Sequence, residues 1–414
     1  MTEKMNTLCV LLALATLTVM AGAHGTARAS EEGKEESVSW QKAFAEKAAS
    51  SLNDVAGFAE TRWRQFSDAM GFHTPRHIAA YRGYATRDAV YVQGRLLANR
   101  PYGGPQDDDH WWDNLKATYE RWESDEIPNA RMRLEYLDQT KNVVTDDEGY
   151  YSAEFMLHER YPESDFVTAK HALEERVLTG SHHISVLDEE AEFLLISDVD
   201  DTIIHTGITN LLVAAQLTFL NNAKTRKPLA GAGSLYQSLA RGHQGHAVNP
   251  VIYLSNSSWN MYDLLRDFID LNDLPRGPLL LRDIGREADS DNHKTETLSN
   301  LFRRYEHLPV VLIGDSGQHD AAYYSSIAAK YPDRVKAIYI RDIDPAENSE
   351  YDVKIDAIIH RNEQNGVPFV RVQSSVQIAE HAVNIGLLPE GALASIEEDT
   401  KKDKARETVA EKAE

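Results

Sequence analysis

Five short apolar runs in the second half of the chain, each followed at once by polar residues, constrain the fold most strongly. Stretches long enough for amphipathic helices separate most of these runs. Near-continuous apolar strands that alternate with helices are typical of a parallel sheet covered on both faces. We therefore predict a three-layer α/β domain with a parallel sheet over residues 191–390. The runs are Phe193–Ile196, Val251–Leu254, Leu279–Leu281, Val310–Ile313 and Ala337–Ile340.

Polar groups follow every one of these five runs. Open α/β sheets bind their ligands outside the carboxyl ends of the strands. We therefore expect the carboxylates, hydroxyls and amides at the five strand ends to converge on one site. The residue pairs that end the runs are Ser197-Asp198, Ser255-Asn256, Arg282-Asp283, Gly314-Asp315 and Arg341-Asp342.

The chain before residue 191 has a different pattern. Residues 75–190 contain short segments of alternating apolar and polar residues, broken by turn-forming residues, which predicts a small β-sandwich domain. Residues 30–74 are charged and alanine-rich with helical spacing, and we expect a helical or linker segment there. At the other end, residues 397–414 alternate acidic and basic side chains, which indicates a frayed solvated helix or a disordered tail, and we assign residues 391–414 to a charged tail.

Residues 1–29 have the pattern of a cleaved secretory signal. Lys4 precedes the apolar run Leu8–Met20, and small residues follow at Ala21-Gly22-Ala23 and Ala27-Arg28-Ala29. The alternative is a membrane anchor, but the run is shorter than the roughly 20 residues that a spanning helix needs. We expect cleavage after Ala23 or Ala29, which would make the mature protein periplasmic or secreted.

Charge and cysteine content exclude several classes of protein. The chain of 414 residues carries a formal net charge of −22, which argues against binding to nucleic acid. Its single cysteine, Cys9, lies inside the predicted signal, so neither a disulfide framework nor a thiolate zinc site is expected. A metal site would therefore use oxygen ligands, for which Mg²⁺ is the natural ion. No protein partner follows from the sequence.

The segment Asp198-Val199-Asp200-Asp201-Thr202 directly follows the first apolar run. Residues two apart on an extended chain point to the same side, so Asp198 and Asp200 can share a site. Asp201 points away and is expected to brace the turn. Two adjacent carboxylates repel each other, and a divalent cation or a shared proton relieves that repulsion.

Other strand ends add the groups that phosphoryl transfer needs. The segment Gly314–Asp320 contributes Asp315 and Asp320, Ser255 can donate a hydrogen bond to a phosphoryl oxygen, and Lys294 can offset negative charge. These groups suit a carboxylate nucleophile that accepts a phosphoryl group. Their order along the chain resembles the four motifs of the haloacid dehalogenase superfamily.

A narrower resemblance covers nearly the whole chain that follows the predicted signal. The matching segments are similar to the actin-patch-type phosphatidate phosphatase family, which pairs a β-rich N-terminal region with a dehalogenase-like catalytic domain. That family dephosphorylates phosphatidate to diacylglycerol. The resemblance implies a Mg²⁺-dependent phosphatase that acts on a phospholipid or another phosphomonoester. The segments are Tyr81–Thr86, Gly94-Arg95-Leu96, Ser197–Gly207, Tyr253–Trp259, Gly277–Gly285 and Leu312–Asp320.

The resemblance also implies roles for individual residues. Asp198 would be the nucleophile that becomes aspartyl-phosphate, Asp200 the general acid and base, and Lys294 a catalytic cation that holds phosphoryl oxygens. Mg²⁺ would bind the Asp198 carboxylate, the Asp200 backbone carbonyl and Asp315, with Asp320 nearby. The remaining expected substrate-binding residues are Ser255, Asn256 and Thr202, of which Thr202 is expected to fix the loop. His205 and His319 adjoin the motifs and are left out of the site.

Too few residues separate Thr202, Ser255 and Lys294 for a full cap domain, so a minimal cap and an open mouth are expected. The apolar segment Ile208–Leu220 follows the first motif. It has two interpretations: a helix beside the site that makes a peripheral contact with acyl chains or a membrane, or a buried core helix.

Two other functions compete with a phosphatase. Gly314-Asp315-Ser316-Gly317 resembles the nucleophile loop of serine hydrolases, with Ser316 as nucleophile, but it follows a predicted parallel strand and no Gly-x-Ser-x-Gly elbow is present. A non-catalytic lipid- or phosphate-binding module on the same fold is the second alternative. The presence of Asp198, Asp200, Lys294 and Asp315 together favours catalysis over this module.

Overall fold

The computed structural model describes residues 76–98, 126–158, 165–173, 176–199, 202, 229–282, 293–316, 319–342, 350–364 and 366–411. All of them fall within one structural unit, Thr74–Glu414. The predicted signal at 1–29, the helical or linker segment at 30–74 and the apolar segment Ile208–Leu220 lie outside the described residues. These three assignments, and the minimal cap, stay predictions.

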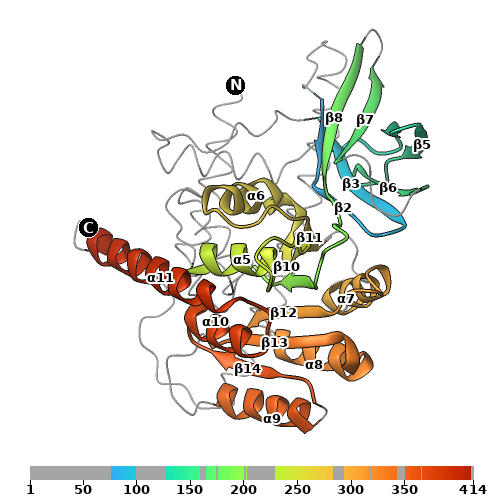
Figure 1. The fold of residues 1–414 in the computed structure, drawn as a ribbon. Coiled ribbons are helices and arrows are strands. Elements are labelled where there is room, and N and C mark those ends of the chain that lie inside the picture. Colours follow the sequence, from blue (N-terminus) through green and yellow to red (C-terminus); the bar gives the residue numbers. More distant parts are fainter. Residues whose placement is uncertain are drawn as a thin grey trace, which may run out of the picture. The chain divides into compact units, whose positions relative to one another are not determined.

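The first half of the described chain forms a mixed sheet of eight strands (Figure 1). Its strand order is β1-β3-β2-β8-β7-β4-β5, with β6 paired to β3, and only the β2–β8 pairing is parallel. The predicted β-rich region is therefore present, and its packing as a sandwich stays a prediction. The strands are β1 (His77–Ala80), β2 (Gly83–Ala85), β3 (Ala89–Leu97), β4 (Arg131–Tyr136), β5 (Gln139–Val144), β6 (Tyr150–Met156), β7 (Phe166–Leu173) and β8 (Arg176–Ser185).

Strand β8 places a histidine in the interior of this sheet region. The His182 side chain is fully buried, and its Nδ1 lies 2.8 Å from the Tyr81 carbonyl oxygen. A carbonyl can only accept, so Nδ1 carries the proton and Nε2 accepts from the Tyr151 hydroxyl at 3.1 Å. Burial lowers the pKa of His182 to about 4, because the charged imidazolium would lose its hydration.

We expect this histidine to make the protein less stable in acid. Unfolding returns the imidazole to a pKa of about 6.5, so the unfolded chain binds the extra proton first and stability falls as the pH drops from 6.5 towards 4. Between pH 7.5 and pH 5 the contribution to the free energy of unfolding is about 2 kcal/mol. Urea unfolding at both pH values measures the change in the free energy of unfolding. The His182→Asn variant is the control, because it lacks the contribution of this imidazole to the pH dependence. Equal pH dependence in both proteins would contradict the assignment.

The second half of the described chain forms a parallel sheet of six strands in the order β11-β10-β9-β12-β13-β14. The five predicted runs are confirmed as strands. The sixth, β14, was missed because Arg371 interrupts its short apolar run. The strands are β9 (Leu194–Ser197), β10 (Val251–Ser258), β11 (Leu279–Arg282), β12 (Val310–Asp315), β13 (Val335–Arg341) and β14 (Phe369–Val372).

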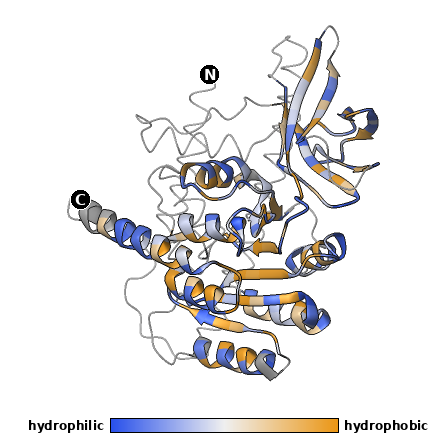
Figure 2. Ribbon diagram, viewed as in Figure 1, coloured by the Kyte–Doolittle hydropathy of each residue, from blue (hydrophilic) through white to orange (hydrophobic). Residues whose placement is uncertain are grey.

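Helices cover both faces of the parallel sheet, as the apolar strands predicted. Leu195 faces a core shared with α5, α6, α10 and α11, whereas Leu194 and Ile196 face a core shared with α7, α8 and α9. Figure 2 shows these strands as predominantly hydrophobic and the covering helices as mixed. The helices are α5 (Ala232–Arg241), α6 (Tyr262–Leu271), α7 (His293–Arg304), α8 (Asp320–Lys330), α9 (Glu350–Gln364), α10 (Ser375–Asn384) and α11 (Glu390–Glu411).

The C-terminal helix corrects the prediction of a solvated tail from residue 391. Ile396 and Thr400 of α11 are buried, and Asp403 accepts a hydrogen bond of 2.9 Å from the backbone of Gly231 at the start of α5. The first half of α11 is therefore part of the α/β core. Ile396 ends the uncharged run Gly391–Ile396, and its burial depends on packing against α5 and α10. No helix among the described residues is both long and apolar enough to cross a membrane.

Candidate active site

Two neighbouring strands bring the first two carboxylates together. Ser197, the last residue of β9, pairs with Ile313 of β12, so Asp198 and Asp315 project beyond the same edge of the sheet. The Asp198 backbone N–H donates to the Ile313 carbonyl at 2.9 Å, which holds Asp198 against β12. From β9 the chain adds β10 and β11 on one side of the sheet, and it then crosses to the other side of β9 to form β12. Open α/β sheets bind their ligands where the strand order reverses in this way.

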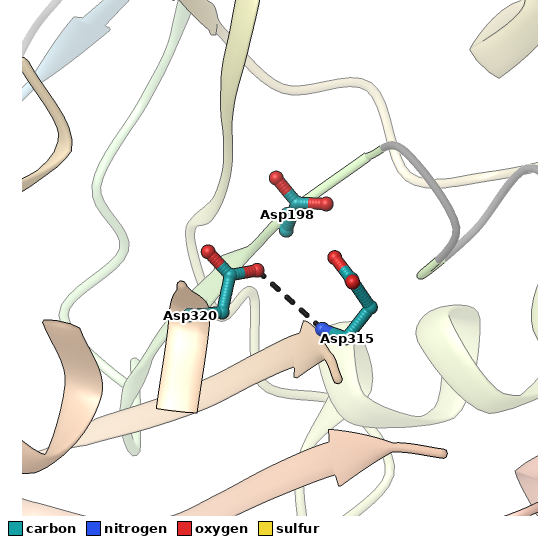
Figure 3. Close-up of side chains that lie close together, drawn as sticks. All are labelled: Asp198, Asp315 and Asp320. Atoms are coloured by element: carbon teal, nitrogen blue, oxygen red, sulfur yellow. Dashed lines mark hydrogen bonds between the residues drawn. The ribbon is translucent and has the colours of Figure 1, made fainter. Parts of the chain in front are cut away.

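Helices α7 and α8 supply the two remaining charged groups. Lys294 in the first turn of α7 donates to Asp198 Oδ1 and to Asp320 Oδ1, both at 2.6 Å. Asp320 begins α8, and its Oδ2 accepts from the Asp315 backbone N–H at 3.4 Å. Asp198, Asp315 and Asp320 each offer a ligand atom within 4.8 Å of the others. Figure 3 shows the three side chains gathered around one point.

The charges in this cluster do not balance. Lys294 is 1% exposed, Asp198 and Asp320 are fully buried, and Asp315 is also buried. Burial by itself would lower the pKa of Lys294, but Asp198 and Asp320 outweigh it and hold the pKa above its usual value. Among the residues that the structure describes, this cluster thus contains three carboxylates and one ammonium, which contacts Asp198 and Asp320. An all-oxygen set with excess negative charge fits a hard divalent cation such as Mg²⁺.

A buried tyrosine and a glycine position these groups. The Tyr236 hydroxyl of α5 lies 2.6 Å from Ser197 Oγ, which donates to the Asp198 carbonyl at 2.7 Å. A side chain at Gly314 would bring its Cβ to 2.6 Å from Asp320 Oδ2, so a glycine is required for α8 to approach β12. Sequence reasoning missed Tyr236, because no spacing or motif links it to a serine 39 residues away.

The structure describes three predicted substrate-binding residues, Ser255, Asn256 and Thr202, but not the predicted general acid Asp200. Ser255 is buried two residues beyond the pairing of Tyr253 with Ser197, at the same sheet edge as Asp198. Its Oγ accepts a hydrogen bond from the Ser257 backbone at 2.8 Å, and Asn256 beside it is half-buried. Thr202 is buried. Asp200 lies outside the described residues, so its role stays a prediction.

The convergence of all five strand ends stays a prediction. Asp342, which follows β13, pairs with Arg371 of the neighbouring strand β14 at 3.5 Å. Asp283 lies outside the described residues. Ser316 is buried directly after β12, and its backbone N–H donates to the Arg341 carbonyl at 2.8 Å. His319 precedes α8, and its ring packs edge-on against Tyr323.

The cluster lies in the part of the chain that matches a known family. Residues 193–342 match the family model described as "Phosphatidate phosphatase APP1, catalytic domain". These residues include Asp198, Lys294, Asp315 and Asp320. This region is therefore similar to the catalytic domain of the actin-patch-type phosphatidate phosphatase family.

Two fungal proteins are similar to this chain. Phosphatidate phosphatase APP1 of Saccharomyces cerevisiae is 32% identical over 156 residues, which cover 36% of this chain and 25% of the yeast protein. An uncharacterized protein of Schizosaccharomyces pombe is 25% identical over 219 residues, which cover 49% of this chain and 34% of that protein. The matched part therefore spans between a quarter and about a third of the length of these relatives.

A solved carbohydrate acetylesterase from Xanthomonas citri has a TM-score of 0.31 and 9% identity, over 73% of this chain and 72% of the other. That likeness is too weak to bear on the fold or the function.

Proposed function

We propose that this protein is a phosphatidate phosphatase, a phosphoric monoester hydrolase that converts phosphatidate to diacylglycerol and phosphate. One observation carries the proposal: a buried cluster of Asp198, Lys294, Asp315 and Asp320 lies within the region that matches the catalytic-domain model. The cluster supplies a carboxylate nucleophile and a fixed cation at the carboxyl edge of the sheet.

In this proposal Asp198 attacks the phosphorus atom of the phosphomonoester. The bond from phosphorus to the diacylglycerol oxygen breaks as the bond to the Asp198 carboxylate forms. Asp200 donates its proton to the departing alkoxide, and its carboxylate then takes a proton from the water that hydrolyses the aspartyl-phosphate. Asp198 is restored, and phosphate leaves.

Lys294 and the backbone contacts keep the nucleophile in place during both steps. The ammonium donates a hydrogen bond to Asp198 Oδ1 and so fixes the position of this carboxylate. Because Asp320 binds the same ammonium, Lys294 is held on two sides and loses little entropy when a phosphoryl group arrives. Ser255 and Asn256 are proposed to donate hydrogen bonds to phosphoryl oxygens.

Mg²⁺ fits the donor set of Asp198 and Asp315, with Asp320 close by. When bound, it would offset the repulsion between the carboxylates and the substrate and stabilise negative charge on the transferring group. The Asp200 backbone carbonyl is the third proposed ligand.

We expect the activity and the stability to depend on Mg²⁺. Phosphate release from phosphatidate should stop after chelation and return on addition of Mg²⁺, and the melting temperature should rise with Mg²⁺ concentration because the ion binds the folded state. The Asp315→Asn variant should lose most of that rise. If chelators leave the rate of phosphate release unchanged, the metal assignment is wrong. If the protein binds Mg²⁺ but hydrolyses no phosphomonoester, the non-catalytic binding module is favoured.

A further inference from the structure

A cavity of about 510 Å³ lies between the mixed sheet and helix α7. Its size is within the range of small-molecule sites, roughly 300–1,000 Å³. His293, which lines one end, directly precedes Lys294 of the active site. Trp259, which lines the same cavity, follows the strand that carries Ser255. The cavity therefore adjoins the proposed phosphate site.

The mixed sheet forms one wall of this cavity. Tyr91 pairs with Glu154 and Gln93 pairs with Ser152 across strands β3 and β6, so the four side chains share one face of the sheet. All four line the cavity. Tyr91 is held by the guanidinium of Arg304, which lies 3.9 Å from the centre of its ring. This wall presents two hydroxyl groups, one amide and the carboxylate of Glu154 on a fixed sheet.

One face of α7 forms the opposite wall. His293, Thr297, Asn300 and Arg304 are spaced by four, three and four residues, which places them along one side of the helix. Lys294 is on another side and contacts Asp198 and Asp320. At 1.5 Å per residue this face extends about 16 Å from the active site. The cavity thus suits an elongated ligand, one end of which lies near the turn of α7 that carries Lys294.

Apart from Arg82, which pairs with Asp270, apolar and aromatic groups make up most of the remaining lining. The rings of Tyr81 and Trp259 stack with their centres 4.5 Å apart, and both line the cavity together with Leu280 and Val92. Rings with one polar edge, mixed with amide and hydroxyl donors, suit a molecule that has both ester carbonyls and methylene groups. A short hydrophilic phosphoester would leave the apolar part of this lining unfilled.

The geometry points to this cavity as the site that holds the glycerol-ester portion of phosphatidate and the first methylenes of its acyl chains. The β-rich region is then one half of the substrate site. The identity of the substrate rests on the proposed function, whereas the position of the cavity beside Lys294 does not. The phosphate lies at the His293 end, the ester carbonyls meet the donors of α7 and of the sheet, and the chains pass the aromatic rings.

Binding to a catalytically inactive protein tests this assignment. In the full chain carrying Asp198→Asn, calorimetry measures the Kd of dihexanoyl phosphatidate and of glycerol 3-phosphate. Thr297→Trp fills the cavity from α7, and Ser152→Trp, at an exposed position on β6, fills it from the sheet. Each is expected to raise the Kd of dihexanoyl phosphatidate at least about tenfold while the Kd of glycerol 3-phosphate changes less than about twofold.

Thr295→Trp is the matched control, because Thr295 is exposed on α7 and is not among the residues that line the cavity. It should leave the Kd of both ligands unchanged. The assignment is overturned if neither cavity variant weakens dihexanoyl phosphatidate, if glycerol 3-phosphate weakens equally, or if the parent protein binds neither ligand. The protein with Asp198 intact separates the two proposals. If it binds dihexanoyl phosphatidate through this cavity but does not hydrolyse it, the proposed activity is wrong and the binding site is retained.

Discussion

Replacement of Asp198 by Asn is expected to lower phosphate release from phosphatidate by at least about a thousandfold. The amide cannot form the aspartyl-phosphate, yet its oxygen can still accept the hydrogen bond from Lys294 that Asp198 Oδ1 now receives. The change also removes one of three buried negative charges, so the fold should persist. Initial rates in mixed micelles and a thermal melt by circular dichroism measure both effects.

Two further variants make this test specific. Asp342→Asn changes an aspartate that also follows a strand of the parallel sheet but pairs with Arg371, and it should leave the rate within about threefold of the original. Ser316→Ala should likewise retain activity. A chain in which Ser316→Ala abolishes hydrolysis while Asp198→Asn spares it would be a serine hydrolase, contrary to the proposal.

Replacement of Lys294 by Met should destabilise the protein strongly. Its ammonium is the cation that the structure places between Asp198 and Asp320, and its removal leaves buried carboxylates without that compensation. Loss of one partner from a buried ionic pair costs about 3–5 kcal/mol of unfolding free energy. Urea unfolding in the presence of a chelator measures the effect without a contribution from bound metal.

Lys402→Met is the matched control, because Lys402 on α11 also contacts two carboxylates, Glu398 at 2.8 Å and Asp399 at 3.4 Å, but is exposed. Water screens such contacts, so the urea midpoint should hardly change. Adding Asp320→Asn to Lys294→Met should recover part of the lost stability by removing a buried charge. Equal effects of the two lysine variants would contradict a charge-balancing role for Lys294.

The carboxylate site was largely predictable from the chain. Buried parallel strands must be apolar, so their ends are visible as the points where polar residues begin, and Asp198 and Asp315 occupy two such ends. Asp320 and Lys294 were predicted from motif order rather than from strand position. The structure adds that one ammonium binds both Asp198 and Asp320.

Other features were hidden because their signal is not local. Strand β14 contains Arg371, whose partners Asp342 and Asp352 come from other parts of the chain. The buried face of α11 includes Ile396, which directly precedes the charged residues that begin at Glu397. Tyr236 supports Ser197 from a helix on the next layer. A sequence window shows none of these, because each depends on which elements become neighbours.

The sequence by itself determined the alternation of strands and helices, the parallel sheet and the identities of the charged residues at its carboxyl edge. Periodicity and strand-end polarity are local properties, and they follow from which side chains must avoid water. Only the tertiary structure decided that Lys294 binds two aspartates and that Asp342 forms an ion pair with Arg371. It also decided that α7 and the mixed sheet line a cavity beside the site. These features depend on contacts between residues far apart in the chain, where distance and burial, not residue type, set the interaction energy.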